Sequence, residues 1–582
     1  MTDAAADPIQ QLTGPGAPFE MVRQDVAGVE LGVYKDRMRS MADLMALADG
    51  HGDQDFVVQG DRRLTFAEHN RAARSVAHGL VERGVEPGDR VTILSANNPE
   101  WIISFWACAL AGAVAVPMNA WWKASEIEFG LTDSGTRMLI CDARRWEVVE
   151  HLRPALPDLT HVFVIGEDDP ADAEPWTVLD DGGTHAGPEV GVDEDDIAGI
   201  FYTSGTTGKP KGATVTHRQV IANLQNIMVV GTAGVMRAAM EGSDDEAPPE
   251  LAAKDHQTAA LLIVPLFHTT GCHATMVLDF AAGYKLVLMP PGRFDPDVAM
   301  EAVEREKISM VGGVPTILWR ILESPNFGKW DLSTVSRISY GGAPASPDLV
   351  KEIHRAFPRA KRSLTNAYGL TETASVATYN SGRDYAERPT SAGRPVPTVE
   401  LRIVQSGGTD AKVGDPGEIW LRGPTISPHG YWQRPEANAE SYTPDRWFMT
   451  GDVGKVDEDG FVYIVDRAKD MVIRGGENVY CVEVEDALYD HEHVIDAAVI
   501  GVPHRTLGEE VKAVVHLKPG TSVEIDELKA FCAERLAAFK VPEHIEFVDA
   551  PLPRNPAGKI LKDALRGGEI SFAAPSDSDQ AL

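Results

Sequence analysis

Hydroxyl, ammonium and glycine residues are concentrated in one stretch of this chain, from Tyr202 to Gly212. It reads Tyr-Thr-Ser-Gly-Thr-Thr-Gly-Lys-Pro-Lys-Gly. Glycines let the backbone approach an anion closely, and hydroxyl and ammonium groups donate hydrogen bonds to it. The apolar residues 197–201 predict a buried strand before the stretch, and residues 216–220 open a helical pattern after it. We therefore predict a strand-to-helix loop that binds the phosphates of a nucleoside triphosphate.

The spacing differs from that of a Walker A loop, which has four residues between its glycines and then Lys-Ser/Thr. Gly205 and Gly208 are two residues apart, and Lys209 precedes a proline. A flexible polar loop is the alternative interpretation of such a cluster. The two lysines and the adjacent apolar strand favour a phosphate-binding loop.

Three further stretches carry groups that could bind a nucleotide. In the sequence Asn-Ala-Tyr-Gly-Leu-Thr-Glu, Tyr368 can stack on a base, Thr371 can donate to a phosphate, and Glu372 can hold Mg²⁺. Asp452 could accept hydrogen bonds from ribose hydroxyls. Taken alone, these would be a core tyrosine, a surface glutamate and a turn aspartate. The charged run 466–478 leads into a glycine pair, and its composition alone indicates a solvated linker.

Composition limits the class of protein. A chain of 582 residues predicts two or more domains. The 87 acidic and 54 basic residues give a formal net charge of −33, which repels nucleic acid and anionic lipid. The five cysteines are scattered without a CxxC pair, which argues against a disulfide framework or a zinc site. The N-terminus lacks the pattern of a signal peptide. We therefore expect a cytoplasmic protein that does not bind nucleic acid.

The elements that position these groups alternate along the chain. Thr65 and Glu68 have capping-box spacing at the start of a predicted helix. The apolar stretch 101–118 contains Ser104 and ends near Pro117, so it predicts a buried helix and strand, with no transmembrane segment. The strand–helix–strand rhythm predicts a largely parallel sheet covered by helices. The acidic residues near 240–256 predict a solvated, disordered insertion, whose role we leave open.

In their order and spacing, these motifs resemble those of the adenylate-forming superfamily. Its members include acyl-CoA synthetases, coumarate-CoA ligases, luciferases and the adenylation domains of peptide synthetases. The chain is most similar to bacterial fatty-acid–CoA ligases, and the resemblance covers roughly residues 60–570. It implies an α/β fold in which residues 1–466 form a large N-terminal domain. That domain would have two helix-covered sheets and a small β-rich subdomain. Residues 467–470 would be a hinge, and residues 471–582 a small, mobile α+β domain.

The resemblance also implies ATP, Mg²⁺ and coenzyme A as ligands. Lys559, in a Pro-x-x-x-x-Gly-Lys motif, would bridge the acid's carboxylate and the α-phosphate. Thr371, Glu372 and His268 would complete the catalytic group, and Glu372 and Thr203 would bind Mg²⁺. The residues expected to bind ATP or CoA are Thr203, Ser204, Gly205, Thr206, Thr207, Lys209, Gly342, Ala343, Pro344, Asn366, Ala367, Tyr368, Gly369, Thr371, Asp452, Arg467, Lys469, Gly475 and Gly476.

The implied reaction joins a carboxylic acid to CoA. The acid attacks the α-phosphorus of ATP to give acyl-adenylate and pyrophosphate, and the CoA thiol then displaces AMP. The C-terminal domain would rotate about Lys469 between the two steps. His268 stands where amino-acid-activating domains typically carry an aspartate, so an amino-acid substrate is not expected. The short sequence after Lys559 leaves no room for a carrier domain, so the expected acceptor is diffusible.

The acid that we favour is fatty, of medium or long chain, or otherwise apolar. Small residues leave space for such a chain at the predicted acid pocket. They are Gly271, Gly312, Gly313, Gly341 and Ala367. The alternatives are an aryl or steroid-side-chain acid, a ligase that makes an amide with an amine, and a nucleotide-binding pseudoenzyme or scaffold. A homodimer is possible.

Overall fold

The computed structural model describes residues 7–203, 210–240, 256–313, 315–341, 347–361, 363–467, 470–474, 477–518, 520–554 and 560–567. Two large sheets lie in the N-terminal part of the chain. The strands of the first, in spatial order, are β11 (Lys211–Thr216), β10 (Ile197–Thr203), β6 (Val114–Pro117), β5 (Arg90–Leu94), β7 (Met138–Asp142), β8 (His161–Ile165) and β9 (Glu174–Pro175). All neighbours in it pair parallel except β10 and β11.

The second sheet contains the strands that lead to the predicted nucleotide site. In spatial order they are β18 (Arg394–Pro395), β17 (Thr378–Ser381), β16 (Leu364–Tyr368), β15 (Arg337–Gly341), β14 (Met310–Gly313), β12 (Ala259–Leu262), β13 (Lys285–Leu288), β3 (Asp55–Gln59) and β4 (Arg62–Thr65). Its central strands, from β16 to β3, are parallel. The predicted, largely parallel sheet covered by helices is confirmed.

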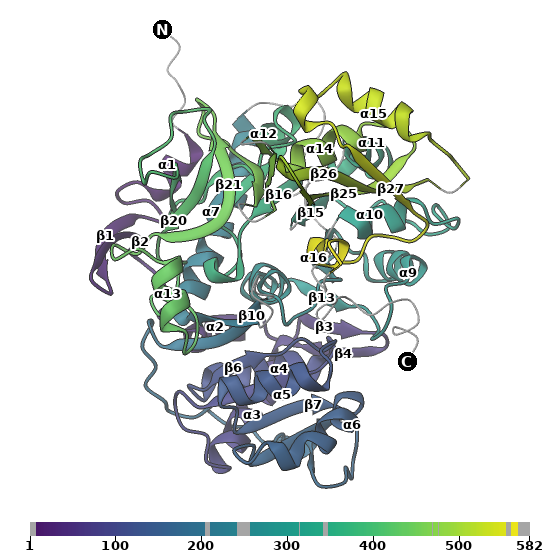
Figure 1. Ribbon diagram of the computed structural model, residues 1–582. Helices are drawn as coiled ribbons and strands as arrows, with labels where there is room; N and C mark the ends of the chain where they lie inside the picture. Colours follow the sequence, from purple (N-terminus) through teal and green to yellow (C-terminus); the bar gives the residue numbers. More distant parts are fainter. Residues whose placement is uncertain are drawn as a thin grey trace.

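Helices cover both sheets (Figure 1). They are α2 (Met41–Ala48), α3 (Phe66–Glu82), α4 (Pro99–Leu110), α5 (Ala124–Ser134), α6 (Ala143–Leu152), α7 (His217–Met240), α8 (Leu278–Ala282), α9 (Pro296–Glu306), α10 (Pro315–Leu322), α11 (Pro347–Ala356) and α12 (Gly382–Glu387). Helix α3 begins with the predicted capping box, because Thr65 accepts from the amide of Glu68 and Glu68 accepts from that of Thr65. A π-helix, η4 (Thr270–Val277), precedes α8.

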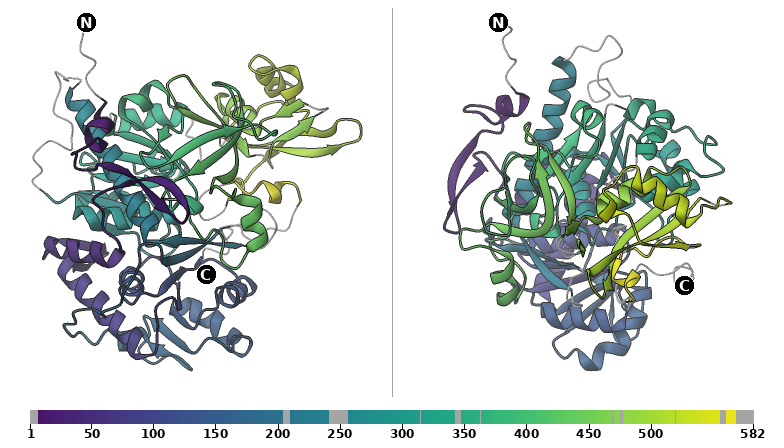
Figure 2. Two further views of the ribbon diagram at one scale, coloured as in Figure 1. Left: turned by 90° about the vertical axis from the view of Figure 1, so that its left-hand side faces the viewer. Right: turned by 45° about the horizontal axis from the view of Figure 1, so that its top comes forward.

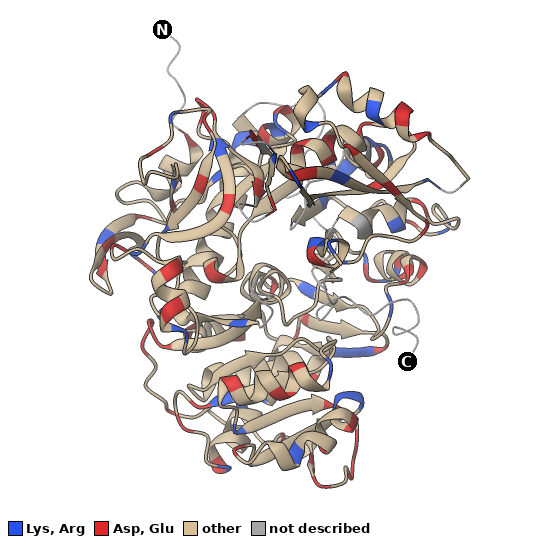
Figure 3. Cartoon of the chain, viewed as in Figure 1, with Lys and Arg blue, Asp and Glu red and all other residues tan. Residues whose placement is uncertain are grey.

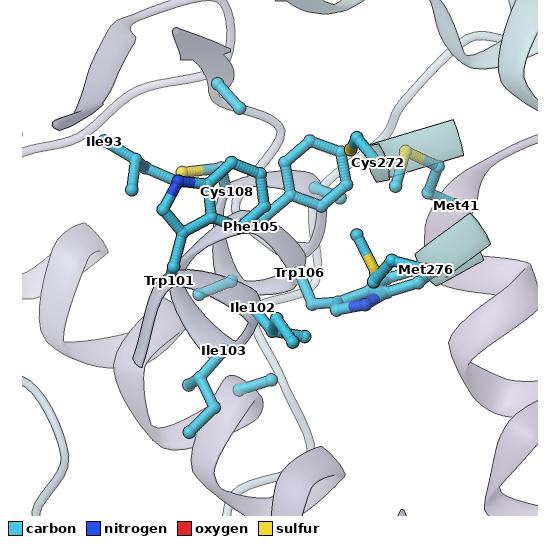
Figure 4. Close-up of a cluster of buried hydrophobic side chains, with 14 of the residues drawn as sticks. Met41, Ile93, Trp101, Ile102, Ile103, Phe105, Trp106, Cys108, Cys272 and Met276 are labelled. Carbon is cyan, nitrogen blue, oxygen red and sulfur yellow. The ribbon is translucent and has the colours of Figure 1, made fainter. Parts of the chain in front are cut away.

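Helix α4 packs at the centre of the largest hydrophobic cluster (Figure 4). Trp101 and Trp106 are fully buried, and their neighbours include Cys272 and Met276 from η4. Burying one large apolar side chain contributes about 1.5–3 kcal/mol, so a helix that is apolar on nearly every side is stable only inside a protein core. The prediction of a buried helix and strand at 101–118 is confirmed by α4 and β6.

The sequence prediction that the glycine-rich loop, residues 202–212, leads from a strand into a helix was wrong. The loop joins β10 to β11, which pair antiparallel from Ile197 opposite Thr216 to Thr203 opposite Lys211. Helix α7 begins only after β11, at His217. The stretch 211–216 forms a strand because its backbone groups complete the edge of the sheet beside β10, with Ala213 and Val215 buried. The predicted phosphate loop therefore connects the two strands of a hairpin.

Two smaller β-rich units follow. One is the predicted β-rich subdomain, with β19 (Glu400–Val404), β20 (Gly417–Arg422), β21 (Phe448–Val456) and β22 (Val462–Arg467). The other is the predicted α+β unit near the C-terminus. It contains β23 (Val472–Arg474), β24 (Glu477–Val479), β25 (Val494–His504), β26 (Gly508–Leu517), β27 (His544–Val548), α14 (Cys481–Tyr489), α15 (Ile525–Ala533) and α16 (Lys562–Leu565). It has a hydrophobic core of its own and lies away from α3 to α6 in Figures 1 and 2.

The remaining elements lie on the surface. Near the N-terminus, α1 (Pro8–Thr13) contacts α7, and β1 (Met21–Val26) pairs with β2 (Val29–Tyr34); α13 (Pro435–Ser441) precedes β21. Acidic and basic residues are interspersed over the described part of the chain (Figure 3). All five cysteines are buried free thiols. Every helix among the described residues is too short or too polar to span a bilayer. The acidic insertion lies outside the described residues.

Candidate active site

Three strands that lead to predicted nucleotide-binding residues end at the same edge of the second sheet. Strands β14, β15 and β16 run parallel, with Gly312 opposite Ser339 and Gly341 opposite Ala367. Their carboxyl ends therefore lie side by side, which is where open α/β sheets bind ligands. Asn366 and Ala367, two of the predicted ligands, are the third and fourth of the five residues of β16.

Tyr368 and Asp452 come from different sheets and touch. The Oη of Tyr368 donates a hydrogen bond to Oδ2 of Asp452 over 2.7 Å, although 84 residues separate them in the chain. Asp452 lies on β21 and is only 6% exposed. The residue predicted to stack on the base and the residue predicted to bind ribose thus form a single polar pair. This geometry suits a nucleoside, in which base and sugar are adjacent.

Glu372 sits in a tight turn directly after β16. The 3₁₀-helix η6 (Thr371–Thr373) carries it, and the turn continues through Ala374 and Ser375, whose φ angles are 56° and 136°. Residues other than glycine rarely adopt such positive φ angles, so packing around the turn must maintain this backbone conformation. Helix α7 contributes Asn223, which accepts from the amide of Val376, and η4 contributes His273, whose Nδ1 lies 2.9 Å from the carbonyl oxygen of Ala374.

The carboxylate of Glu372 has a partner that the sequence did not reveal. Tyr431 Oη donates a hydrogen bond to its Oε1 over 2.6 Å. Burial, and secondly the charge of Glu372, raise the pKa of Tyr431 far above its usual value, so the phenol stays protonated and acts as the donor. Nothing local to Tyr431 distinguishes it from a core tyrosine, because its partner is 59 residues away. Tyr431 therefore belongs to the surroundings of the predicted metal ligand.

A carboxylate of this kind fits Mg²⁺, which prefers oxygen ligands. Glu372 is 7% exposed, and its Oε1 accepts a hydrogen bond from the neutral phenol of Tyr431. Among the described residues, no group of three or more His, Cys, Asp or Glu side chains forms a ready-made metal site. Mg²⁺ is commonly held by one or two carboxylates together with substrate phosphates.

The strands that flank the glycine-rich loop are tied to their surroundings. Thr203 Oγ1 donates to the carbonyl oxygen of Lys211 over 3.3 Å, across the base of the hairpin. Tyr202 Oη donates to Oδ2 of Asp133 on α5 over 2.8 Å, and Arg434 forms an ion pair with the other oxygen of the same carboxylate. The two ends of the loop are therefore held at fixed positions on the sheet.

His268 follows β12 and faces an apolar environment. Its Nε2 is shielded from solvent and has no hydrogen-bond partner among the described residues, and its ring lies 4.9 Å from that of Phe267. Burial lowers its pKa to about 4, so the imidazole is neutral at physiological pH. A neutral histidine can orient a bound acid by a hydrogen bond but does not attract it by charge.

Several predicted site residues cannot be placed. Those outside the described residues are Ser204, Gly205, Thr206, Thr207, Lys209, Gly342, Ala343, Pro344, Lys469, Gly475, Gly476 and Lys559. Arg467 is described by its backbone, which lies opposite Asp452 in the pairing of β21 with β22. The structure thus brings together Tyr368, Asp452, Thr371 and Glu372. The roles of all predicted site residues stay predictions.

Comparison with family models identifies the group of proteins. The model of the AMP-binding enzyme matches residues 45–432, and that of the AMP-binding enzyme C-terminal domain matches residues 483–559. The chain belongs to the AMP-binding enzyme family. This confirms the predicted resemblance to adenylate-forming enzymes.

Individual relatives of this AMP-binding enzyme are similar over most of its length. A feruloyl-CoA synthase of Amycolatopsis is 38% identical over 88% of this chain and 95% of its own. The human mitochondrial medium-chain acyl-CoA ligase ACSF2 is 34% identical over 88% of this chain and 84% of its own. Two solved structures also match. ATP-bound MatB from Rhodopseudomonas palustris has a TM-score of 0.78 and 30% identity, and covers 91% of this chain and 99% of its own. The amide bond synthetase McbA from Marinactinospora thermotolerans has a TM-score of 0.76 and 28% identity, and the match covers 90% of this chain and 99% of McbA.

The comparisons confirm the predicted fold and an enzyme of the acyl-CoA synthetase type. Acyl-CoA synthetases of this family use ATP, Mg²⁺ and coenzyme A. The comparisons do not identify the acid.

Proposed function

We propose that this AMP-binding enzyme joins an apolar carboxylic acid to coenzyme A in two steps. The acid and ATP form acyl-adenylate and pyrophosphate, and the CoA thiol then displaces AMP to give the thioester. The observation that carries the proposal is the convergence of the Tyr368–Asp452 pair and the Glu372–Tyr431 pair beside one sheet edge. The first pair suits a nucleoside, and the second suits the metal that accompanies its phosphates.

The chemical difficulty is that both reactants of the first step are anions. A carboxylate must approach a polyphosphate, and negative charge builds up further on the phosphoryl oxygens as the new bond forms. Glu372 and Thr203 would hold Mg²⁺, which offsets this charge as a Lewis acid when bound. Lys559 would contribute an ammonium group to the same end. Tyr368 and Asp452 would bind the adenosine and fix its orientation.

For the acid, we favour a fatty chain of medium or long length. The strand ends that would border it are built from small residues, with Gly312 and Gly313 on β14 and Gly341 on β15. ACSF2, one of the relatives, is named for medium-chain acids. The second candidate is an aryl acid. It is supported by the feruloyl-CoA synthase and by an aromatic contact beside His268, in which the rings of Trp121 and Phe267 are 5.5 Å apart.

A panel of acids tests this proposal. Purified protein is given ATP, Mg²⁺ and one acid at a time, from short and long fatty acids to hydroxycinnamic and steroid-side-chain acids, and pyrophosphate release is measured. We expect release to rise with fatty chain length up to an optimum. Preference for hydroxycinnamic acids would establish the aryl alternative. No release with any acid would contradict ligase activity and favour a nucleotide-binding scaffold.

The acceptor requires a separate measurement. The enzyme should consume the preferred acid only when CoA is present, and the product should be a thioester. The similarity to an amide bond synthetase makes an amine the competing acceptor. If the acid is consumed with amines and not with CoA, the protein is an amide-forming ligase.

Substitution of Lys559 separates the two steps. Lys559→Ala should abolish adenylate formation and spare thioester formation from supplied acyl-adenylate, because the ammonium group is needed only while charge develops at phosphorus. The exposed Lys412→Ala, which removes a charge far from the motif in sequence, serves as the control. Loss of both steps in Lys559→Ala would contradict this assignment.

The domain arrangement of residues 1–466, 467–470 and 471–582 also belongs to the proposal. It is supported by the change of sheet between β22 and β23. If the C-terminal domain turns about Lys469, then Lys469→Pro should stall thioester formation while adenylation survives, because proline fixes φ at the pivot. Normal thioester formation in that variant would place the pivot elsewhere. A homodimer and a cytoplasmic location stay predictions, and the former can be tested by light scattering.

A further inference from the structure

We infer that Tyr431 is a positioning residue for the metal-binding carboxylate and couples it to the strand beside the phosphate loop. This inference rests on the proposed function, in which Glu372 binds Mg²⁺. Tyr431 lies outside every stretch that the sequence marked as functional. Its place in the structure, and not its local sequence, indicates the role.

The first step of the argument is that the backbone of Tyr431 is fixed against β11. Ala213 and Tyr431 form an isolated β-bridge, and the amide of Trp432 donates to the carbonyl oxygen of Gly212 over 2.7 Å. On the other side, the amide of Thr214 donates to the carbonyl oxygen of Gly430 over 3.0 Å. Residues 430–432 therefore act as a short additional strand along β11.

A second set of contacts holds the same segment from the side. Asn438 Oδ1 accepts from the amide of Tyr431 over 2.6 Å, and Asn438 Nδ2 donates to its carbonyl oxygen over 3.0 Å. Trp432 Nε1 donates to the carbonyl oxygen of Asp133 over 3.2 Å, and Arg434 pairs with the carboxylate of the same residue. Tyr202, at the end of β10, also donates to that carboxylate. The segment 430–434 is thus tied to both strands of the hairpin.

The side chain of Tyr431 connects this framework to the turn that carries Glu372. Its hydroxyl donates to Glu372 Oε1 over 2.6 Å, and Lys211 Nζ lies 5.1 Å from the centre of its ring. Lys211 is the first residue of β11, directly after the loop. One aromatic side chain therefore contacts both the start of β11 and the predicted metal ligand. Fixing Oε1 restricts the rotation of the carboxylate, which is how outer partners of metal ligands act.

The chain offers a matched control in Tyr442. Its ring lies 6.3 Å from that of Tyr431, and its hydroxyl is buried without a hydrogen-bond partner among the described residues. Tyr442→Phe removes the same atom from the same neighbourhood without breaking a hydrogen bond. Tyr431→Phe keeps the ring, and so keeps its contacts with Lys211 and Tyr442.

Calorimetric titration of the full-length protein with ATP tests the inference, once with Mg²⁺ and once with a chelator. In Tyr431→Phe we expect the affinity for ATP with Mg²⁺ to fall about tenfold, the loss typical of one hydrogen bond to a charged group. The affinity for metal-free ATP should be unchanged, as should both affinities in Tyr442→Phe. The inference would be overturned if Tyr431→Phe lowered the affinity for ATP equally with and without Mg²⁺, or if it did not lower that affinity at all.

Two further measurements separate positioning from stability and from the proposed reaction. In a Glu372→Gln background, Tyr431→Phe should cause no additional loss of Mg²⁺-dependent affinity, because the two residues act through one contact. A full additional loss would contradict the coupling. The titrations need no acid and no turnover, so they remain decisive if the wild-type protein fails to form an acyl-adenylate. That failure would refute the proposed function and leave the Tyr431 result to be judged by binding alone.

Discussion

Replacing Gly369 by alanine is the sharpest test of the turn that carries Glu372. A Cβ at this position would lie 1.5 Å from the carbonyl oxygen of Ser375, 2.6 Å from its carbonyl carbon and 3.1 Å from the amide nitrogen of Ala377. All three are backbone atoms, so no side-chain rotation can relieve the contact. Real Cβ atoms do not approach closer than 3.0 Å, so the two segments must separate by at least 1.5 Å.

Such a separation would displace Glu372, because the amide of Ala377 closes the turn by donating to the carbonyl oxygen of Tyr368 over 2.8 Å. A misplacement of 1 Å at a reacting centre can cost about 100-fold in rate. We therefore expect Gly369→Ala to lower the rate of adenylate formation by about 100-fold or more. Overpacking against backbone should also destabilise the protein, by about 1–3 kcal/mol.

The assay is pyrophosphate release at saturating ATP with the preferred acid. Thioester formation from supplied acyl-adenylate is measured in parallel. Gly231→Ala is the control, because an added Cβ there meets nothing within 4 Å, and Gly231 lies within the helix α7, where alanine is the better helix former. Wild-type adenylation in Gly369→Ala, with an unchanged urea midpoint, would show that the turn does not position the carboxylate.

Two pH dependences follow from buried titratable groups. Burial alone would raise the pKa of Glu306, but hydrogen bonds from Arg63 and Lys285 lower it from 4.5 to about 2. The ionised Glu306 carboxylate therefore contributes about 3 kcal/mol to the free energy of unfolding. This contribution is fully present above pH 4.5 and is lost as the pH falls toward 2. Glu306→Gln should therefore flatten the acid side of a plot of urea midpoint against pH, and an unchanged slope would contradict the assignment. Because burial lowers the pKa of His268 to about 4, adenylation should show no inflection from this residue between pH 5 and 8. An inflection near pH 6.5 that disappears in His268→Asn would show that the imidazole titrates normally.

Local sequence patterns predicted elements whose stabilising contacts are also local. The capping box at Thr65 and Glu68 involves residues three positions apart, and the apolar run around Trp101 and Trp106 requires burial wherever it lies. Both were predicted correctly. The motif residues Tyr368 and Glu372 could be selected because the resemblance placed them in a known order.

Contacts between distant segments could not be predicted in this way. Strand β11 was missed because the edge of the sheet that it completes is supplied by β10, and the loop residues before it dominate the local composition. Tyr431 was missed because its function depends on Glu372 and Lys211, which come from two other parts of the chain. The partners of a side chain are set by sheet order, and sheet order is not encoded in any single short window.

The register of β21 and β22 has a consequence for turnover. Asp452 is directly opposite Arg467, which is both the last residue of β22 and the first residue of the proposed hinge. Ladder hydrogen bonds anchor that point to the sheet that carries Asp452, the carboxylate proposed to bind ribose. A rotation of the small domain would thus start from a stationary sheet edge. The nucleoside end of the intermediate would stay in place while the residues contributed by the small domain change. A single adenosine subsite could then serve both half-reactions, with AMP leaving only after the thioester has formed.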